Sequence, residues 1–96
     1  MGDYWVYIMT NKANTVLYTG MTNNLHRRVL EHQTGQGSGF TAKYRIGKLV
    51  FYERFDKTVD AIAAEKRIKA GSRRKKEELI NSINAEWKDL FVEIKG

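Results

Sequence analysis

Two apolar runs separated by a short turn segment open the chain. Residues 4–9 and 15–19 are rich in β-branched and aromatic side chains, the residue types that are enriched in strands. The segment Asn11-Lys12-Ala13-Asn14 between them has the composition of a turn. The two strands are therefore expected to form an antiparallel hairpin, with Tyr7 and Tyr18 near each other on adjacent strands.

The pattern then changes from a strand period to a helical one. The second strand ends at Gly20, and the polar residues at 22–24 offer side chains that can cap a helix. The helix is expected to run over about residues 24–33. Four of its residues share one face: Leu25, Arg28, Val29 and His32. A core-facing stripe should be apolar, so the arginine and the histidine conflict with simple packing, and such conflicts often mark functional sites.

A glycine-rich loop and a third strand follow this helix. The loop at residues 34–39 contains three glycines. It is not expected to hold a phosphate, because no strand leads into it and no clear helix start follows it. The apolar run Leu49–Phe55 predicts a third strand, in a central position of the sheet with both of its faces covered.

Two further helices and a helical turn complete the pattern. A helix with Thr58 as its N-cap is expected to continue to about Ala70. The pair Gly71-Ser72 then breaks it and caps a second helix over residues 73–83. The ambiguous tail is expected to form a short helical turn over residues 85–90. The order β-β-α-β-α-α predicts an α+β fold in which helices pack against a small three-stranded sheet.

Length and composition indicate one globular domain. The chain has 96 residues, of which 42% are hydrophobic, so residues 1–96 are expected to fold as a single domain. No apolar run approaches the roughly 18 residues that span a bilayer, and the first residues do not resemble a leader. The lack of cysteine excludes disulfides and cysteine-based zinc sites. A soluble, cytoplasmic protein is expected.

The positive charge is concentrated in one segment. The net charge is +6 and the isoelectric point about 9.7, which favours polyanionic partners. Residues 65–76 contain seven basic side chains and a single acidic one. Nucleic acid is the first partner that this predicts and an anionic membrane surface the second, whereas a solvated helix face is the simplest alternative. The candidate nucleic-acid-binding residues are Lys43, Lys66, Lys69, Arg73, Arg74, Lys75 and Lys76.

Five side chains are candidates for catalysis: Tyr7, Tyr18, Arg28, His32 and Glu65. Glu65 is the one carboxylate on an apolar helix stripe, which argues against a two-carboxylate glycosidase and against a metal cage of protein ligands. A single carboxylate is a usual way to hold Mg²⁺, which keeps several waters and takes substrate phosphate oxygens. Arg28 could stabilise phosphoryl charge, and a tyrosine helped by a cation could position or deprotonate water. Together these groups predict metal-assisted phosphodiester hydrolysis.

Each candidate also has a purely structural interpretation. Strand tyrosines often pack a ring and bond a hydroxyl. His32, near a helix C-terminus, could simply favour the helix dipole. Arg28 could pair with Glu31, and Glu65 could pair with a neighbouring arginine or lysine rather than with a metal.

The order and spacing of these residues resemble the GIY-YIG nuclease pattern. The matching residues are, in chain order, Val6-Tyr7-Ile8, Tyr18-Thr19-Gly20, Arg28, His32 and Glu65. Trp5-Val6 stands where the name of the first half-motif has Gly-Ile, and Thr19 where the second has Ile. The chain is most similar to small stand-alone bacterial GIY-YIG proteins that are described as endonucleases, over a core of about residues 4–91.

The resemblance implies an antiparallel three-stranded sheet flanked by helices, and cleavage of DNA or RNA with a divalent metal, Mg²⁺ or Mn²⁺. By position it makes Tyr7 or Tyr18 the general base, Arg28 the catalytic arginine and His32 the histidine that assists it. It makes Glu65 the metal ligand and Gly20 the closing glycine, where the backbone must turn without a side chain.

The sequence therefore predicts a single-domain, metal-dependent endonuclease that hydrolyses nucleic-acid phosphodiester bonds, with DNA favoured as the partner. The alternative is a basic nucleic-acid-binding module that keeps the nuclease fold with little or no turnover. The first predicts cleavage that depends on Arg28 and Glu65, and the second predicts salt-sensitive binding that does not depend on Glu65.

Overall fold

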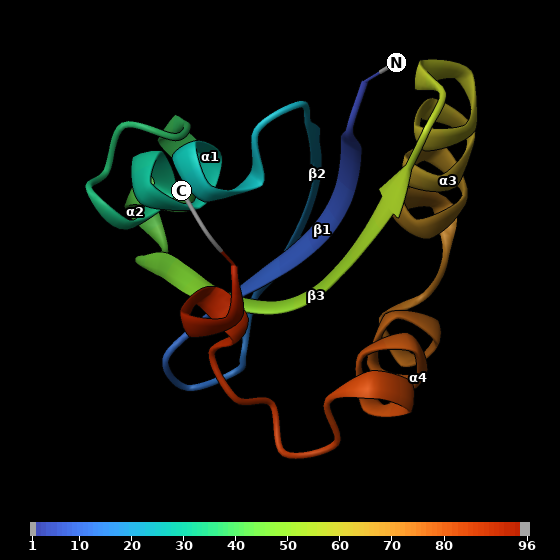
Figure 1. Ribbon diagram of the computed structural model, residues 1–96. Helices are drawn as coiled ribbons and strands as arrows, with labels where there is room; N and C mark the ends of the chain where they lie inside the picture. The colour runs from blue at the N-terminus through green and yellow to red at the C-terminus, as the bar shows by residue number, and fades with distance from the viewer. Residues whose placement is uncertain (1, 95–96) are drawn as a thin grey trace.

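A three-stranded antiparallel sheet lies at the centre of the computed structural model, which describes residues 2–94 (Figure 1). Its strands are β1 (Tyr4–Asn11), β2 (Leu17–Thr22) and β3 (Ile46–Phe55), in the order β2-β1-β3. β1 and β2 form the predicted hairpin, in a register that pairs Tyr7 with Gly20 and Met9 with Tyr18. The predicted α+β fold and its element order are confirmed, with one additional short helix.

Helices cover both faces of the sheet (Figure 1). One face carries α1 (Leu25–Gln33), α2 (Gly39–Lys43) and the 3₁₀ helix η1 (Leu90–Glu93), and the other carries α3 (Thr58–Ala70) and α4 (Arg73–Ile83). Successive strand residues point to opposite faces. Tyr7 and Met9 therefore lie in the core under α1, whereas Val6 and Ile8 lie in the cores under α3 and α4.

β1 is the central strand, so the prediction of a central position for Leu49–Phe55 is wrong. β3 pairs with β1 and forms an edge of the sheet. Its middle is nonetheless covered on both faces, because Leu49 lies in the core under α1 while Val50 and Phe51 lie in the core under α4. Val50 and Phe51 are consecutive residues, and a register shift opposite Ile8 places both of them in the same core. An apolar run thus indicates that both faces of a strand are covered, and a strand at the edge of a sheet can also be covered on both faces.

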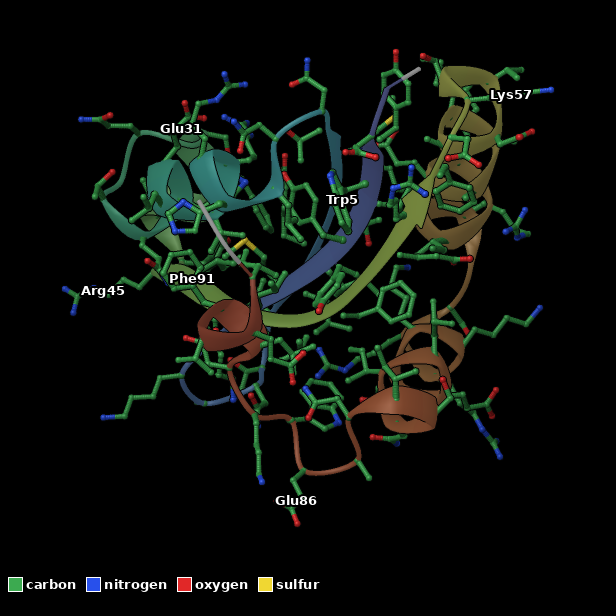
Figure 2. The ribbon with its side chains drawn as sticks, viewed as in Figure 1. Trp5, Glu31, Arg45, Lys57, Glu86 and Phe91 are labelled. Atoms are coloured by element: carbon green, nitrogen blue, oxygen red, sulfur yellow. The ribbon has the colours of Figure 1, made fainter. Side chains whose placement is uncertain are left out.

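Two of the three predicted helix starts are confirmed. The side chain of Asn24 caps α1, and that of Ser72 caps α4, each by accepting a backbone N–H of the first turn. Thr58 is not a cap, since it is the first residue of α3. Lys57 occupies the cap position without a capping side-chain hydrogen bond, and Figure 2 shows its side chain pointing away from the sheet.

The short helices differ from the sequence prediction. α2 begins directly after the glycine-rich loop, where no helix start was expected, because Ser38 accepts the backbone N–H of Thr41 at 3.1 Å. The predicted turn over residues 85–90 is replaced by η1 further along the chain. Trp87 has a φ of 55°, which interrupts helical backbone, and Asp89 caps η1 while also accepting the N–H of Leu49 at 3.1 Å. Within residues 2–94, no helix combines the length and apolarity needed to cross a membrane.

Candidate active site

The register of the hairpin places the ring of Tyr7 across Gly20. The two residues are direct partners on β1 and β2, and a Cβ built on Gly20 would lie only 2.4 Å from the Tyr7 hydroxyl oxygen. A glycine is therefore required here because the neighbouring ring passes so close to its backbone. Tyr18 lies on the same face of the sheet, and the two tyrosine ring centroids are 6.4 Å apart.

Helix α1 brings His32 onto the Tyr7 hydroxyl. The Tyr7 hydroxyl oxygen and His32 Nε2 are 3.0 Å apart, and this hydrogen bond is buried. His32 is only 2% exposed, and its ring also packs edge-on against Tyr18, with 5.2 Å between the centroids. The predicted inward direction of His32 is confirmed, and its polar ring is accommodated because it has hydrogen-bond partners.

Arg28 is held beside this pair by two hydrogen bonds. Its Nη1 donates to Glu31 at 2.8 Å and its Nη2 donates to the carbonyl oxygen of Gly37 at 2.9 Å. The structural interpretation of Arg28 is thus correct in part, since the pair with Glu31 exists. A guanidinium has five N–H donors, so these bonds fix its position and leave donors for a ligand.

The environment sets the protonation states of Tyr7 and His32. Burial raises the pKa of Tyr7 to about 12, although the Arg28 guanidinium beside the hydroxyl opposes that shift. Burial, with the positive charge of Arg28, lowers the pKa of His32 to about 4, against the opposing charge of Glu31. At neutral pH a protonated phenol therefore faces a neutral imidazole.

Glu65 stands apart from the hydrogen-bonded cluster. It lies on α3, and its side chain is 21% exposed and pairs with Lys69 at 3.3 Å. Its negative charge contributes to the raised pKa of Tyr7, but the described residues give no hydrogen bond between Glu65 and the other four candidates. The structure thus brings Tyr7, Tyr18, Arg28 and His32 together, with Glu65 near enough to act through its charge.

Glu65 has the chemistry of a partial metal site. Within residues 2–94 no group of three or more His, Cys, Asp or Glu side chains is arranged to hold a metal ion. Lys69 lies 3.3 Å from Oε2 of the Glu65 carboxylate. One accessible carboxylate suits Mg²⁺, which keeps several waters and shares the phosphate oxygens of a substrate, and does not suit an ion that needs a full protein cage.

The loop before α2 and the first turn of α2 contribute residues that the sequence did not single out. His32 Nδ1 lies 3.0 Å from Thr41 Oγ1, and Thr41 is completely buried. A Cβ on Gly37 would lie 2.0 Å from His32 Nδ1. A buried histidine needs a partner for each ring nitrogen, so a nearby threonine or serine was the available signal, although the pattern does not show which one folds back onto the helix.

The candidate nucleic-acid-binding residues divide into anchored and unanchored side chains. Arg73 donates to the carbonyl oxygens of Asn14 and Thr15 at 2.7 and 2.8 Å, and Lys76 donates to the carbonyl of Gly71 at 2.6 Å. These two therefore hold the β1–β2 turn and the end of α3.

Two more of the candidate nucleic-acid-binding residues form ion pairs. Arg74 pairs with Glu78 at 3.5 Å and Lys69 with Glu65 at 3.3 Å. Lys66 and Lys75 form no ion pair within residues 2–94. Lys43 lies on the other face of the sheet, with its ammonium 5.3 Å from the ring centroid of Tyr44.

This combination defines a class of protein: a small α+β domain whose sheet carries a buried tyrosine–histidine pair beside an arginine. A family model described as the GIY-YIG catalytic domain matches residues 3–78, and the chain belongs to this family. The recognition made from the spacing of Tyr7, Tyr18, Arg28, His32 and Glu65 is confirmed. Members of this family are nuclease-type domains that act on nucleic acids.

Similar relatives are UPF0213 proteins. One from Natronomonas pharaonis is 44% identical over 78 residues, which cover 81% of this chain and 91% of that protein. One from Clostridium perfringens is 40% identical over 90 residues, covering 94% and 96%. The solution NMR structure of a UPF0213 protein from Bacillus halodurans matches with a TM-score of 0.59 at 31% identity, covering 91% of this chain and 92% of that one.

Proposed function

We propose that this protein is a metal-dependent endonuclease that hydrolyses phosphodiester bonds in nucleic acid, with DNA as the favoured substrate. The observation that carries the proposal is the 3.0 Å hydrogen bond between the Tyr7 hydroxyl and His32 Nε2, beside the anchored guanidinium of Arg28. A proton-handling pair next to a fixed cation is the minimum needed to activate water and stabilise a phosphoryl transition state.

Arg28 supplies the electrostatic part of this reaction. Its guanidinium is held from two directions, so little side-chain freedom is lost when it binds phosphate oxygens. A positioned donor of this kind typically contributes about 10²–10³-fold to turnover. The bond to Glu31 engages Nη1 of Arg28, and the guanidinium keeps further N–H donors for phosphate oxygens.

Tyr7 orients water and passes a proton to His32. Moving the Tyr7 proton to His32 in the resting protein is strongly uphill, because burial raises the pKa of Tyr7 to about 12 and lowers that of His32 to about 4. An ionised tyrosine is therefore not present beforehand, and the proton leaves Tyr7 only as the proton of the attacking water arrives. Tyr18, whose ring contacts both partners, is the second candidate base.

Glu65 would hold the metal ion through its carboxylate. Lys69 would either leave the carboxylate or keep its contact with Glu65 Oε2. The ion, Mg²⁺ or Mn²⁺, would supply Lewis-acid stabilisation of phosphate charge. The contribution of the chain is a single accessible carboxylate near the Tyr7 hydroxyl.

Nicking of supercoiled, branched and single-stranded DNA with Mg²⁺ or Mn²⁺ tests this proposal. Arg28→Ala and Glu65→Gln are each expected to lower single-turnover cleavage at least about 100-fold. The matched controls are Arg45→Ala, at a residue that points into solvent (Figure 2), and Glu53→Gln, at an exposed position of β3. Cleavage that survives both site substitutions would contradict the assignment.

A basic binding module without turnover is the second candidate. The unpaired lysines Lys66 and Lys75 on α3 and α4 favour it, because free ammonium groups can release counterions from a phosphate backbone. This function predicts salt-sensitive binding that Lys66→Ala and Lys75→Ala weaken, no metal-dependent cleavage, and no dependence on Glu65. A cytoplasmic location is part of either proposal and rests on the sequence.

A further inference from the structure

His32 is buried with both ring nitrogens engaged. Nε2 lies 3.0 Å from the Tyr7 hydroxyl, and Nδ1 lies 3.0 Å from the hydroxyl of Thr41. A neutral imidazole carries one N–H donor and one acceptor nitrogen, so the two hydroxyls cannot play the same role. If one hydroxyl accepts a hydrogen bond from the imidazole, the other must donate one to it.

The surroundings of Thr41 determine that direction. Its hydroxyl lies 3.2 Å from the carbonyl oxygen of Ser38, and because a carbonyl can only accept, this bond uses the single hydroxyl proton of Thr41. Ser38 Oγ accepts the backbone N–H of Thr41 at 3.1 Å and lies 3.0 Å from Thr41 Oγ1. With that proton engaged, Thr41 Oγ1 has only lone pairs left for its two other contacts, the Ser38 hydroxyl and His32 Nδ1.

The same loop also fixes where the imidazole can lie. The backbone of Gly37 passes so close that a Cβ there would lie 2.0 Å from His32 Nδ1. The carbonyl oxygen of Gly37 accepts from Arg28 at 2.9 Å. Residues 37–41 thus hold the side chains of Arg28 and His32, on which the proposed chemistry depends. Within residues 2–94 they form no hydrogen bond with the Tyr7 hydroxyl.

We infer that Thr41 is a positioning residue that holds His32 as the Nδ1–H tautomer, so that Nε2 stays unprotonated and accepts the proton of Tyr7. With Nε2 protonated instead, the imidazole would donate to the Tyr7 oxygen and could not receive a proton from it. The contribution of Thr41 to turnover rests on the proposed function, whereas the tautomer itself is a property of the free protein.

Long-range ¹H–¹⁵N spectra of histidine-labelled protein at pH 7, without metal or nucleic acid, test the inference. His32 in the wild type is expected to be protonated at Nδ1, with a slowly exchanging Nδ1–H signal. Thr41→Ser keeps the hydroxyl and should keep this tautomer. Thr41→Val keeps the shape and removes the acceptor, so the population should shift towards Nε2–H. Thr10→Val is the matched control, because Thr10 is an equally buried threonine whose hydroxyl bonds Val16 instead.

Cleavage kinetics supply the second arm of the test. Thr41→Val is expected to lower kcat by about 10–100-fold with KM nearly unchanged, as removal of a partner that orients a functional histidine does, and Thr41→Ser should restore most of it. A wild-type His32 protonated at Nε2 would overturn the inference, as would an unchanged tautomer in Thr41→Val. The wild-type spectrum decides the assignment even if Thr41→Val does not fold. A wild type that shows the expected tautomer and cleaves nothing would refute only the proposed nuclease function.

Discussion

The two faces of the sheet are buried to a similar degree but hold different kinds of side chain. On β1, Val6 and Ile8 are fully buried among aliphatic neighbours of α3 and α4. Tyr7, the residue between them, is 1% exposed and bonds a buried histidine. Hydroxyls and imidazoles lose hydration on burial, so the polar face persists only because its groups are satisfied by one another.

The α3–α4 face contributes mainly to stability, whereas the α1–α2 face also carries the candidate site. Small and aliphatic residues on the α3–α4 face can pack without directional bonds, and they stabilise the sheet on which the site is built. The α1–α2 face has an apolar core of its own, but it adds a hydrogen-bonded network around His32, and a change there alters protonation and orientation as well as packing. Substitutions on the α3–α4 face should therefore lower stability, whereas substitutions in the network should also lower turnover.

The largest expected effect is on the apolar face. Ile8 is completely buried against Val50, Phe51 and Ile80, so Ile8→Ala should lower the free energy of unfolding by about 2–5 kcal/mol through lost burial and a cavity. Urea unfolding measures this loss. Turnover per folded molecule should remain near that of the wild type, and a selective loss of kcat in fully folded protein would show that the two faces are not separable.

Acidification should weaken the polar face. The pKa of His32 is about 4 in the folded protein against its ordinary 6.5, so the unfolded chain binds more protons between these values. Stability from this group is complete above pH 6.5 and falls, by up to about 3 kcal/mol, as the pH decreases to 4. Urea unfolding across this range should show a shallower pH dependence for His32→Gln than for wild type. A parallel dependence in both proteins would contradict the buried, neutral histidine, and His26→Gln controls for the other histidine.

Gly20→Ala should disturb both stability and chemistry. The added Cβ would lie 2.4 Å from the Tyr7 hydroxyl oxygen, so the ring must move away from its position at His32. We expect about 1–3 kcal/mol of destabilisation, as for other overpacked sites, together with a loss of kcat in the folded fraction. Thermal unfolding and single-turnover cleavage measure the two effects. Wild-type turnover in Gly20→Ala would show that the position of Tyr7 is not important.

The smallest effect is expected at the surface of α4. Arg73→Ala removes bonds to Asn14 and Thr15 and an exposed pair with Glu77, and should cost at most about 1 kcal/mol. Lys75→Ala removes no ion pair of the described chain and should leave the unfolding midpoint unchanged while reducing the salt dependence of nucleic-acid binding. Equal effects of both substitutions on binding would show that Arg73 also serves as a phosphate contact.

Much of the site could be predicted because its residues sit on regular elements. Helical spacing put Arg28 and His32 on a stripe that should have been apolar, and strand pairing put Tyr7 beside Tyr18. Both placements are confirmed. The helix pattern also singled out Glu65 on an inward stripe, the family resemblance gave it the same metal-binding role, and the structure finds its side chain half-buried.

The contributions of the loop and the sheet order could not be predicted in the same way. Thr41 is the third residue of α2, and the loop before that short helix has an irregular path with no repeat, so only the folded chain shows which hydroxyl returns to the imidazole. The apolar run of β3 does not distinguish an edge strand with two covered faces from a central one. Local spacing thus identifies the candidate catalytic residues, while the residues that support them depend on long-range geometry.

Single-turnover cleavage of duplex, branched and single-stranded DNA by wild type and Arg28→Ala, side by side with Mg²⁺ and with a chelator, tests the central claim most directly. The buried tyrosine–histidine pair beside Arg28 predicts metal-dependent cleavage by the wild type and a loss of at least about 100-fold in the variant, with unchanged folding. Equal cleavage by both folded proteins, or none by the wild type on duplex, branched and single-stranded substrates, would contradict the account.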